Sequence, residues 1–450
     1  MSEVHLHDTR TGRLLPLEPK HPGRVRIYVC GPTVYGRIHV GNARPFVVFS
    51  LLKRFLVREG YEVTFVANVT DINDKIYAAA HRLQVGSQQL AEEMTAHYIA
   101  DTDALGLGRP DHEPLASQAI PEIISLIEQL IKTGHAYEAE GDIYFSVRSY
   151  PSYGELSHRQ IDQMDQGEGV EGAERKRDPL DFALWKAQKP DEDTAWEAPW
   201  GWGRPGWHIE CSAMAETLLG VDFEIHGGGT DLIFPHHENE AAQTAAARGE
   251  PLARLWVHNG MVRTNQEKMA KSVGNIFLLH AALDSCGRDA LIMYFCAGHY
   301  RQPIEFDDAR LAAALASVSR VREAARRLTP GPSPEWSRRW REEFFSALRE
   351  DFNTPRALAA VFEWVRQANS SSDPVGDADL RDMLEVLGLA NLLDVDAPNA
   401  PPEAVALSEE RQAARERRDW QRADALRDQL RDLGWEVRDG PDGGELIPVQ

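Results

Sequence analysis

The chain has 450 residues, and its 49 Lys and Arg against 70 Asp and Glu give a formal net charge of −21 at pH 7. This length predicts roughly three domains of about 150 residues each, which excludes a small disulfide-stapled scaffold. The acidic balance argues against a protein that coats nucleic acid, because phosphate binding depends on Lys and Arg, but it leaves room for a local basic face.

The sequence gives no sign of membrane insertion or secretion. No apolar run approaches the roughly 18 residues that a transmembrane helix needs. Met1–Arg13 is polar and lacks the apolar stretch of a secretory signal. We therefore expect a cytoplasmic protein that does not contact membranes. Its four cysteines form no CxxC pair, which suits a reducing compartment: Cys30, Cys211, Cys286 and Cys296.

The first organised unit alternates strand, helix and strand. Residues 26–30 are apolar enough for a buried strand, residues 41–59 carry apolar side chains at helical spacing, and residues 62–66 resume as a strand. This is the pattern of a βαβ unit with a right-handed crossover. It predicts two neighbouring parallel strands.

A second strand, loop and helix follow later in the chain. We expect a strand over residues 221–225, a loop over residues 226–231 and a helix from about His236 to Ala247. Two such units predict an open parallel sheet, which binds ligands at the carboxyl ends of its strands. Residues 167–205, rich in Gly, Pro and Trp, read as an insertion between them.

The remainder of the chain is predicted to be mainly helical. Helical patterns cover residues 311–328 and 336–392, each followed by a Pro-rich linker. The tail from Leu407 reads as two Arg- and Glu-rich helices split near Asp419, followed by two short strands. This predicts a helical bundle and a small C-terminal α/β domain after the parallel sheet.

Residues 39–42, His-Val-Gly-Asn, lie between a predicted strand and the first turn of a helix. Unpaired backbone N–H groups and the helix dipole favour a phosphate there, and His39 and Asn42 add side-chain donors. Gly41 allows a nucleotide to approach the backbone. A capped turn with no ligand is the alternative interpretation.

Residues 268–272, Lys-Met-Ala-Lys-Ser, place two lysines three positions apart on a short loop. Both ammonium groups can reach one polyphosphate and stabilise the charge that moves to pyrophosphate when the bond to the α-phosphorus breaks. In isolation the string fits a solvated surface loop better. Together with residues 39–42 it favours a nucleotide site.

A candidate metal site combines residues from distant parts of the sequence. His236 and Glu240 share one face of a helix at the i, i+4 spacing, Cys30 ends the first strand, and Cys211 lies early in a helix. If the strand ends meet at one crevice, these four can supply a tetrahedral zinc site. Buried structural cysteines are the alternative.

Other residues near this set have competing interpretations. His237 or Glu238 can compete for the role of ligand. Cys286 and Cys296 lie in or beside an apolar helical stretch, and we expect them to be packing residues.

The motifs jointly resemble those of the cysteinyl-tRNA synthetases, a family of class I aminoacyl-tRNA synthetases. The resemblance spans nearly the whole chain, and its specificity lies in the order and spacing of the motifs. They are residues 30–35, 39–42, 206–214, 226–231, 234–240, 268–272 and 351–355, together with the Arg-rich tail.

The resemblance implies ATP-dependent activation of L-cysteine to cysteinyl-adenylate, with release of pyrophosphate, and transfer to the terminal adenosine of tRNA(Cys). His39 and Asn42 match the HIGH element of the family, and Lys268 and Lys271 match its KMSKS loop, so these four are the expected catalytic residues. Zinc is implied at Cys30, Cys211, His236 and Glu240. The implied ATP contacts are Gly31, Thr33, His39, Gly41, Asn42, Asp231, Lys268, Lys271 and Ser272, with Mg²⁺ accompanying ATP.

Two positions depart from the common class I patterns. Asn42 stands where many of these enzymes have His, and Ala270 stands where they have Ser. Asn still donates a hydrogen bond but carries no charge, so the departure bears on the pH dependence of phosphate binding. We expect activity to survive both changes.

The zinc has a physical rationale as a selectivity device. Cysteine and serine differ by one atom, so an apolar pocket separates them by only a few kcal/mol. Zinc binds the substrate sulfur as thiolate, whereas a neutral hydroxyl is a poor ligand. We expect serine to be rejected without an editing domain. Trp207 is expected to wall the amino-acid pocket; Thr70 and Asp231 are candidate polar contacts, with a helix cap or turn as the alternative for each.

For tRNA, the candidate surfaces are the helices after Arg310 and the tail. Pairing of Asp with Arg on solvated helices is the alternative for individual residues. The tail arginines in question are Arg417, Arg418, Arg422, Arg427 and Arg431.

The expected fold is therefore α/β: a class I Rossmann-type parallel-sheet catalytic domain with an insertion, then a helical bundle and a small C-terminal α/β domain. The rival functions are a ligase that joins cysteine to an amino sugar, as in mycothiol synthesis, and a catalytically silent zinc- or RNA-binding relative. By family precedent we expect a monomer. The expected domains are 1–120 and 206–250 (catalytic), 121–205 (insertion), 251–308 (lysine loop), 309–395 (helical bundle) and 403–450 (C-terminal tRNA and anticodon binding).

Overall fold

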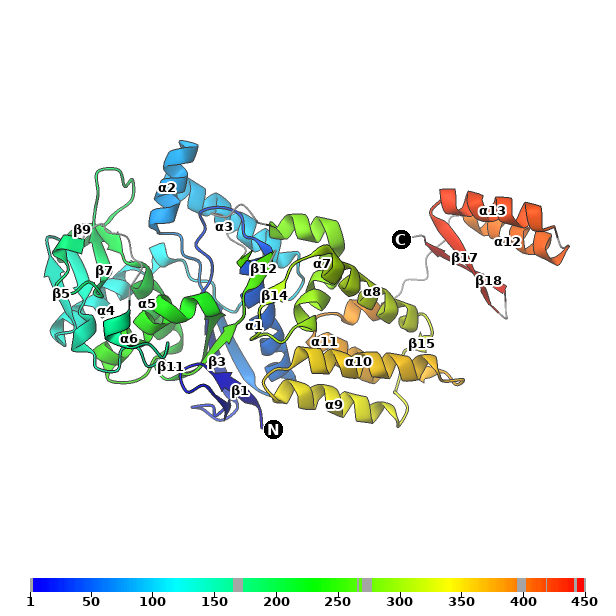
Figure 1. Cartoon of the computed structure of the whole chain (residues 1–450), viewed down its shortest axis with the longest axis horizontal. Coiled ribbons are helices and arrows are strands. Elements are labelled where there is room, and N and C mark those ends of the chain that lie inside the picture. Colours follow the sequence, from blue (N-terminus) through cyan, green and yellow to red (C-terminus); the bar gives the residue numbers. More distant parts are fainter. Residues whose placement is uncertain are drawn as a thin grey trace. The chain divides into compact units, whose positions relative to one another are not determined.

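The computed structural model describes residues 3–164, 173–264, 267–268, 277–394, 402–417, 419–440 and 443–448. The chain divides into two compact units, Met1–Ala390 and Asn391–Gln450 (Figure 1). In these described ranges, no helix combines the length and the apolar character needed to cross a membrane.

A four-stranded parallel sheet lies at the centre of the first unit. Its strand order is β11-β10-β3-β4, and every neighbouring pair is parallel. The crossover from β3 to β4 is α1 (Val40–Arg58), which follows the N-cap His39 and contains Pro45 in its second turn. The predicted βαβ unit is thereby confirmed. The strands are β3 (Arg24–Val29), β4 (Glu62–Ala67), β10 (Phe223–Gly229) and β11 (Ala253–Asn259).

The second predicted strand was placed too early and made too short. The glycine-rich residues 226–229 were expected in a loop, but they form the second half of β10. The strand is buried along its whole length, and a Cβ at Gly227 would lie 2.2 Å from the ring of Phe49 on α1. Glycine is therefore used here for close packing between helix and strand rather than for a turn. The following helix, α6 (Glu238–Arg248), begins two residues later than expected, after a turn over Ile233–His237 in which Phe234 has an extended backbone.

The order in which strands are added to this sheet reverses between β3 and β10, although all four strands are parallel. From β3 the chain moves outward through α1 to β4, whereas β10 and β11 extend the sheet on the other side. Such a switch point leaves a crevice at the carboxyl ends of the two central strands. Residues that follow β3 and β10 therefore meet there.

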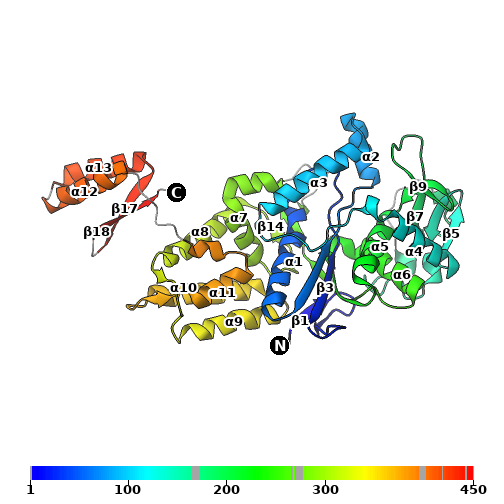
Figure 2. The same cartoon turned by 180° about the vertical axis from the view of Figure 1, so that it is seen from behind.

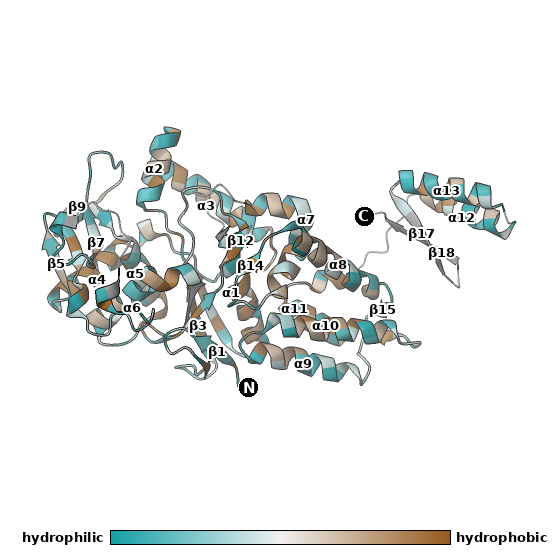
Figure 3. Ribbon diagram, in the orientation of Figure 1, coloured by the Kyte–Doolittle hydropathy of each residue, from teal (hydrophilic) through white to brown (hydrophobic). Residues whose placement is uncertain are grey.

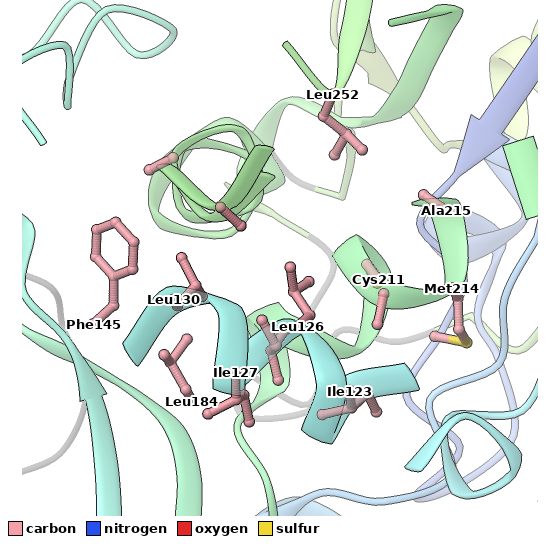
Figure 4. Packing of buried hydrophobic residues seen from close by; sticks show 14 of the residues in the cluster. Ile123, Leu126, Ile127, Leu130, Phe145, Leu184, Cys211, Met214, Ala215 and Leu252 are labelled. Atoms are coloured by element: carbon pink, nitrogen blue, oxygen red, sulfur yellow. The ribbon is translucent and has the colours of Figure 1, made fainter. Parts of the chain in front are cut away.

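The segment between β4 and β10 contains helices and a five-stranded antiparallel sheet of order β5-β6-β7-β9-β8. Figure 4 shows Ile123, Leu126, Ile127 and Leu130 along α4 close to Cys211, and all five belong to one buried cluster. The apolar face of α4 therefore packs behind the helix that carries Cys211. The elements are α2 (Asp74–Leu83), α3 (Ser87–Asp103), α4 (Ile120–Lys132), β5 (Ala136–Ala139), β6 (Asp142–Phe145), β7 (Phe182–Ala187), β8 (Trp196–Ala198), β9 (Gly201–Pro205) and α5 (Trp207–Leu219).

After β11 the chain forms small strands and then helices. Figure 2 shows α4, α5 and α6 on one side of α1 and β3, and α9, α10 and α11 on the other side. The elements are β12 (Val262–Thr264), β13 (Glu267–Lys268), α7 (Leu279–Ala297), β14 (Ile304–Glu305), α8 (Asp308–Ala325), β15 (Leu328–Thr329), α9 (Ser337–Arg349), α10 (Thr354–Asn369), β16 (Val375–Gly376) and α11 (Ala378–Val386). An N-terminal hairpin is formed by β1 (His5–Asp8) and β2 (Arg13–Pro16).

The second unit has the predicted order of two helices and a hairpin. It contains α12 (Pro402–Glu416), α13 (Trp420–Asp432), β17 (Trp435–Gly440) and β18 (Gly443–Pro448). Figure 3 shows its two helices as predominantly hydrophilic, in line with their Arg- and Glu-rich sequence. Its own small core is formed by Ala414, Ala423 and Leu426 with Leu407 packed against them.

Candidate active site and metal centre

A cleft of about 530 Å³ opens at the carboxyl ends of β3 and β10. Its walls come from the residues after β3, the first turns of α1, the start of α5 and the segment that follows β11. Of the residues singled out in the sequence, it is lined by Cys30, Gly31, Thr33, His39, Gly41, Asn42, Trp207 and Asp231. Distant motifs thus converge on one cavity.

The four candidate metal ligands come together beside this cleft. One donor atom each from Cys30, Cys211, His236 and Glu240 lies within 4.8 Å of the other three, and all four residues are buried. Cys30 Sγ lies 3.2 Å from Glu240 Oε1, and His236 Nε2 lies 3.1 Å from the same oxygen. Two thiols, an imidazole and a carboxylate about one point form a donor set that fits tetrahedral zinc.

The electrostatics of this cluster also suit a cation. Burial raises the pKa of the Cys30 thiol well above its ordinary value, and Cys211 and Glu240 raise it further. Burial, together with nearby His208 and His226, lowers the pKa of His236 well below its ordinary value. The imidazole is therefore neutral, as a metal ligand must be, and a divalent cation would favour the thiolates that burial disfavours.

A second group overlaps the first. Cys30 and Glu240 also lie within 4.8 Å of His226 and His237 through their donor atoms. His226 Nε2 contacts Glu240 Oε2 at 2.9 Å, and His237 Nε2 lies 3.9 Å from Glu240 Oε1. His237 was foreseen as a competitor, but His226 was missed because the glycines after it suggested a loop. The signal that could have indicated His226 is its position directly after the apolar residues of the strand, which suggests that the strand continues through it.

Glu238, the other competitor, has a different role. It is buried, and its carboxylate accepts hydrogen bonds from the backbone N–H groups of Gly154 at 2.8 Å and Ser157 at 2.7 Å. It therefore ties the start of α6 to residues 154–157, in the segment between β6 and β7. Cys296 is buried and Cys286 is half-buried on α7, and neither belongs to the groups found among the described residues.

Residues 39–42 form a capped helix turn that also faces the cleft, so the two interpretations of this motif, a capped turn and a phosphate site, are compatible. His39 Nδ1 accepts a hydrogen bond from the Asn42 backbone N–H at 3.3 Å, and Asn42 Oδ1 accepts one from the His39 N–H at 3.2 Å. This reciprocal cap fixes the turn. Both residues also line the cleft, so the capped N-terminus of α1 faces the cavity where a phosphate is expected.

The loop after β3 leaves no room for a side chain at Gly31. A Cβ there would lie 1.7 Å from the carbonyl oxygen of Asn68, while the Gly31 N–H donates to Asn68 Oδ1 at 2.9 Å. The neighbouring Thr33 pairs with Thr70 in an isolated parallel bridge. This close approach holds the loop that carries Cys30.

The amino-acid pocket residues differ in their surroundings. The Trp207 ring stacks on His236 with 4.2 Å between ring centroids and also faces the cleft. Thr70 is buried and accepts a hydrogen bond from Asn68 Nδ2 at 3.2 Å, and it is not among the residues that line the cleft. Asp231 is exposed on the turn after β10 and lines the cleft.

The lysine loop is described only in part. Lys268 ends β13, which pairs with β12 through Arg263. Lys271 and Ser272 lie outside the described residues, as does Ala270.

Comparison with known proteins places these features in a family. A model of the class I (C) tRNA synthetase catalytic domain matches residues 16–316, a DALR domain matches residues 343–394, and a cysteinyl-tRNA ligase anticodon-binding domain matches residues 397–445. Cysteine–tRNA ligases from Pseudothermotoga lettingae and Pelotomaculum thermopropionicum are 45% and 42% identical over 455 and 478 residues. These alignments cover 98% of this chain and 98% and 99% of the two relatives.

The chain belongs to the cysteine–tRNA ligase family. Solved structures agree on the fold of this family member: a Mycobacterium tuberculosis methionyl-tRNA synthetase bound to methionyl-adenylate has a TM-score of 0.61 at 16% identity, covering 82% of this chain and 90% of that one. A leucyl-tRNA synthetase from Agrobacterium radiobacter has a TM-score of 0.60 at 12% identity, covering 84% and 85%. The class I parallel-sheet fold expected from the sequence is thus confirmed.

Proposed function

We propose that this cysteine–tRNA ligase family member activates L-cysteine with ATP and transfers the cysteinyl group to the 3′ adenosine of tRNA(Cys). Pyrophosphate leaves in the first step and AMP in the second. The observation that carries the proposal is the buried group of Cys30, Cys211, His236 and Glu240 beside a cleft that the first turn of α1 also lines. A group of residues that fits a sulfur-binding metal therefore lies beside a helix N-terminus that suits a phosphate.

The first step requires positioning and charge stabilisation from the protein. The substrate carboxylate attacks the α-phosphorus itself, so no protein nucleophile is needed. His39 and Asn42 contribute donors at the N-terminus of α1, and Lys268 and Lys271 contribute positive charge to the leaving pyrophosphate. Gly31, Thr33, Gly41, Asp231 and Ser272 complete the proposed ATP contacts, and Mg²⁺ accompanies the nucleotide.

Selection of cysteine over serine follows from the donor set. When bound by Cys30, Cys211, His236 and Glu240, zinc supplies an affinity for the substrate thiolate that a hydroxyl does not match. The residues themselves exclude water from this corner, since all four are buried. Trp207 stacks on His236 and limits the space for larger amino acids. Thr70 does not line the cleft, so we propose that it acts on the substrate site indirectly, through its hydrogen bond with Asn68.

The amino-sugar ligase is the less favoured function. Residues 343–394 and 397–445 match a DALR domain and a cysteinyl-tRNA ligase anticodon-binding domain, which serve a tRNA and are superfluous for a sugar. A catalytically silent relative is not favoured either, because the named relatives that match nearly the whole chain are ligases.

The deciding experiment is charging of total tRNA by the purified chain with radiolabelled cysteine and ATP. We expect ATP-dependent label on tRNA with cysteine, none with serine, and no tRNA-dependent ATP hydrolysis in the presence of serine. Transfer of cysteine only to a glucosaminyl-inositol acceptor would overturn the proposal.

A further inference from the structure

Arg44 is an arginine in the interior of the protein. It lies in α1, shortly after the capped turn of His39 and Asn42, and its side chain is 0% exposed. Among the residues that the structure describes, no carboxylate pairs with it. Burying a charge without a counter-charge is costly. Such a residue calls for a reason other than stability.

Three backbone carbonyl groups take the place of a carboxylate. Arg44 Nη1 donates to the carbonyl oxygens of Gly260 at 2.6 Å and Met261 at 3.2 Å, and Nη2 donates to that of His299 at 3.2 Å. Burial lowers the pKa of Arg44 to about 10, so the guanidinium keeps its charge at neutral pH. Its planar fork suits several acceptors at once in a way that the single ammonium of Lys does not.

Two of the three acceptor carbonyls, those of Gly260 and Met261, belong to the segment that leads into the lysine loop. Gly260 and Met261 join β11 to β12, and β12 pairs with β13 so that Arg263 stands opposite Lys268. The same segment is also hydrogen-bonded to the chain after α7, since Gly260 N–H donates to Tyr300 O at 2.8 Å and Met261 O accepts from Ile304 N–H at 3.0 Å.

The same segment forms one wall of the cleft, and α1 forms another. Gly260, Met261 and Val262 line the cleft together with Gly41 and Asn42. The two walls approach closely, because a Cβ at Gly41 would lie 3.7 Å from the Cβ of Val262. Arg44 thus links α1, which carries the His39–Asn42 turn, to Gly260 and Met261, which lead into the strand pair that carries Lys268.

We propose that Arg44 is a positioning residue for adenylate formation, which fixes the Gly260–Met261 backbone against α1 and so sets the separation between the His39–Asn42 turn and Lys268. This inference rests on the proposed function, because it assigns ATP to the cleft. Arg44 touches no reacting atom in this assignment. We expect Arg44 to affect adenylate formation, the step in which the His39–Asn42 turn and Lys268 both act on the polyphosphate of ATP.

The test measures cysteine-dependent ATP–pyrophosphate exchange by Arg44→Lys and Arg44→Gln. We expect kcat to fall about 10- to 100-fold, because small displacements of positioned groups cost factors of that size. The KM for cysteine and the zinc content should stay within about two-fold of wild type, because the metal cluster is held by other elements. Arg44→Lys keeps the charge and should lose less; if Arg44→Gln does not fold, Arg44→Lys alone decides.

A double-mutant cycle separates positioning from a general loss of packing. In a Lys268→Ala background, Arg44→Lys should lower kcat by less than about three-fold, because its effect passes through the lysine strand. The matched control is Phe55→Leu, a buried residue of the same helix whose ring lies 5.9 Å from that of Phe352, and it should lower the melting temperature with little change in kcat.

Two results would overturn the inference: kcat of Arg44→Lys equal to wild type, or the same factor lost in both backgrounds. Failure of the proposed function gives a different result, namely a wild-type chain that shows no cysteine-dependent exchange at all.

Discussion

At the scale of single residues, Glu240 lies at the middle of the candidate metal-binding cluster. Its two carboxylate oxygens contact Cys30, His236 and His226. Further histidines orient the ligands from behind, since His208 Nδ1 lies 2.9 Å from His236 Nδ1. Hydrogen bonds of this kind fix the tautomer and the ring orientation of a metal-binding imidazole. The cluster is therefore built before any substrate enters.

Replacement of one sulfur ligand tests this arrangement. We expect Cys211→Ser to lower zinc affinity and cysteine-dependent pyrophosphate exchange by at least about 100-fold, because even the loss of a residue behind a ligand costs about 10- to 100-fold. The matched control is Cys286→Ser on α7, outside the two donor groups of the described residues. Metal analysis after dialysis and exchange kinetics give the readout. Equal zinc content and activity in the two variants would remove Cys211 from the metal site.

At the scale of elements, a buried acid joins the central strands. Glu224 in β10 is 1% exposed, and its carboxylate accepts hydrogen bonds from Lys20 N at 2.9 Å, Arg26 N at 2.8 Å and Arg26 Nε at 2.9 Å. Burial alone would raise the pKa of Glu224, but these donors outweigh it and hold the pKa below its ordinary value. The contact fastens β10 and β3, from which the cleft is built.

Glu224 also gives a prediction for pH dependence. A carboxylate whose pKa is lower in the folded state stabilises the fold above its unfolded pKa of about 4.3, and this stability is lost as the pH falls through the folded pKa. We expect Glu224→Gln to lower the free energy of unfolding by about 2 kcal/mol at pH 7. The difference from wild type should shrink below about pH 4. Denaturant titrations at pH 7 and pH 3 measure it, and an equal difference at both values would contradict the account.

Several of these elements could be predicted from the sequence, and the failures have physical causes. Apolar patterns were sufficient for β3, α1 and β4, and Arg- and Glu-rich composition was sufficient for the tail helices, because each pattern is local. The extension of β10 through Gly227 was missed, because glycine signals a turn unless the ring packed against it is known. Arg44 was missed for a similar reason, since a charged residue on a helix reads as exposed.

The candidate site could be predicted from the sequence only in part. Residue types and spacing suggested Cys30, Cys211, His236 and Glu240, and the resemblance narrowed the choice, but only the fold brings their donor atoms together. His226 depends on which face of β10 it occupies, which the sequence does not reveal without the strand boundary. The roles of Lys271 and Ser272 stay predictions, since both lie outside the described residues.

At the scale of the whole molecule, the division into two compact units separates two tasks. Met1–Ala390 contains the cleft and the candidate metal ligands, whereas Asn391–Gln450 has its own core and includes residues 397–445, which match an anticodon-binding domain. Under the proposed function, we assign activation of cysteine to the first unit. We expect both units to contribute to tRNA recognition, because linked binding modules raise the effective affinity for a shared ligand.

Truncation after residue 394 tests this separation. We expect the shortened chain to keep cysteine-dependent pyrophosphate exchange within about two-fold of the full chain and to lose at least about 10-fold in kcat/KM for tRNA charging. Exchange and charging are measured on the same preparations. Undiminished charging by the truncated chain would show that the second unit does not contribute to tRNA recognition.

The central claim is that Cys30, Cys211, His236 and Glu240 hold zinc and that the substrate sulfur joins them. X-ray absorption at the zinc edge counts sulfur neighbours directly, since Zn–S bonds of about 2.3 Å are distinct from Zn–N and Zn–O bonds of about 2.0 to 2.2 Å. We predict two sulfur neighbours in the free protein, three with L-cysteine and two with L-serine. A zinc-free protein, or a sulfur count that L-cysteine leaves unchanged, would contradict the account.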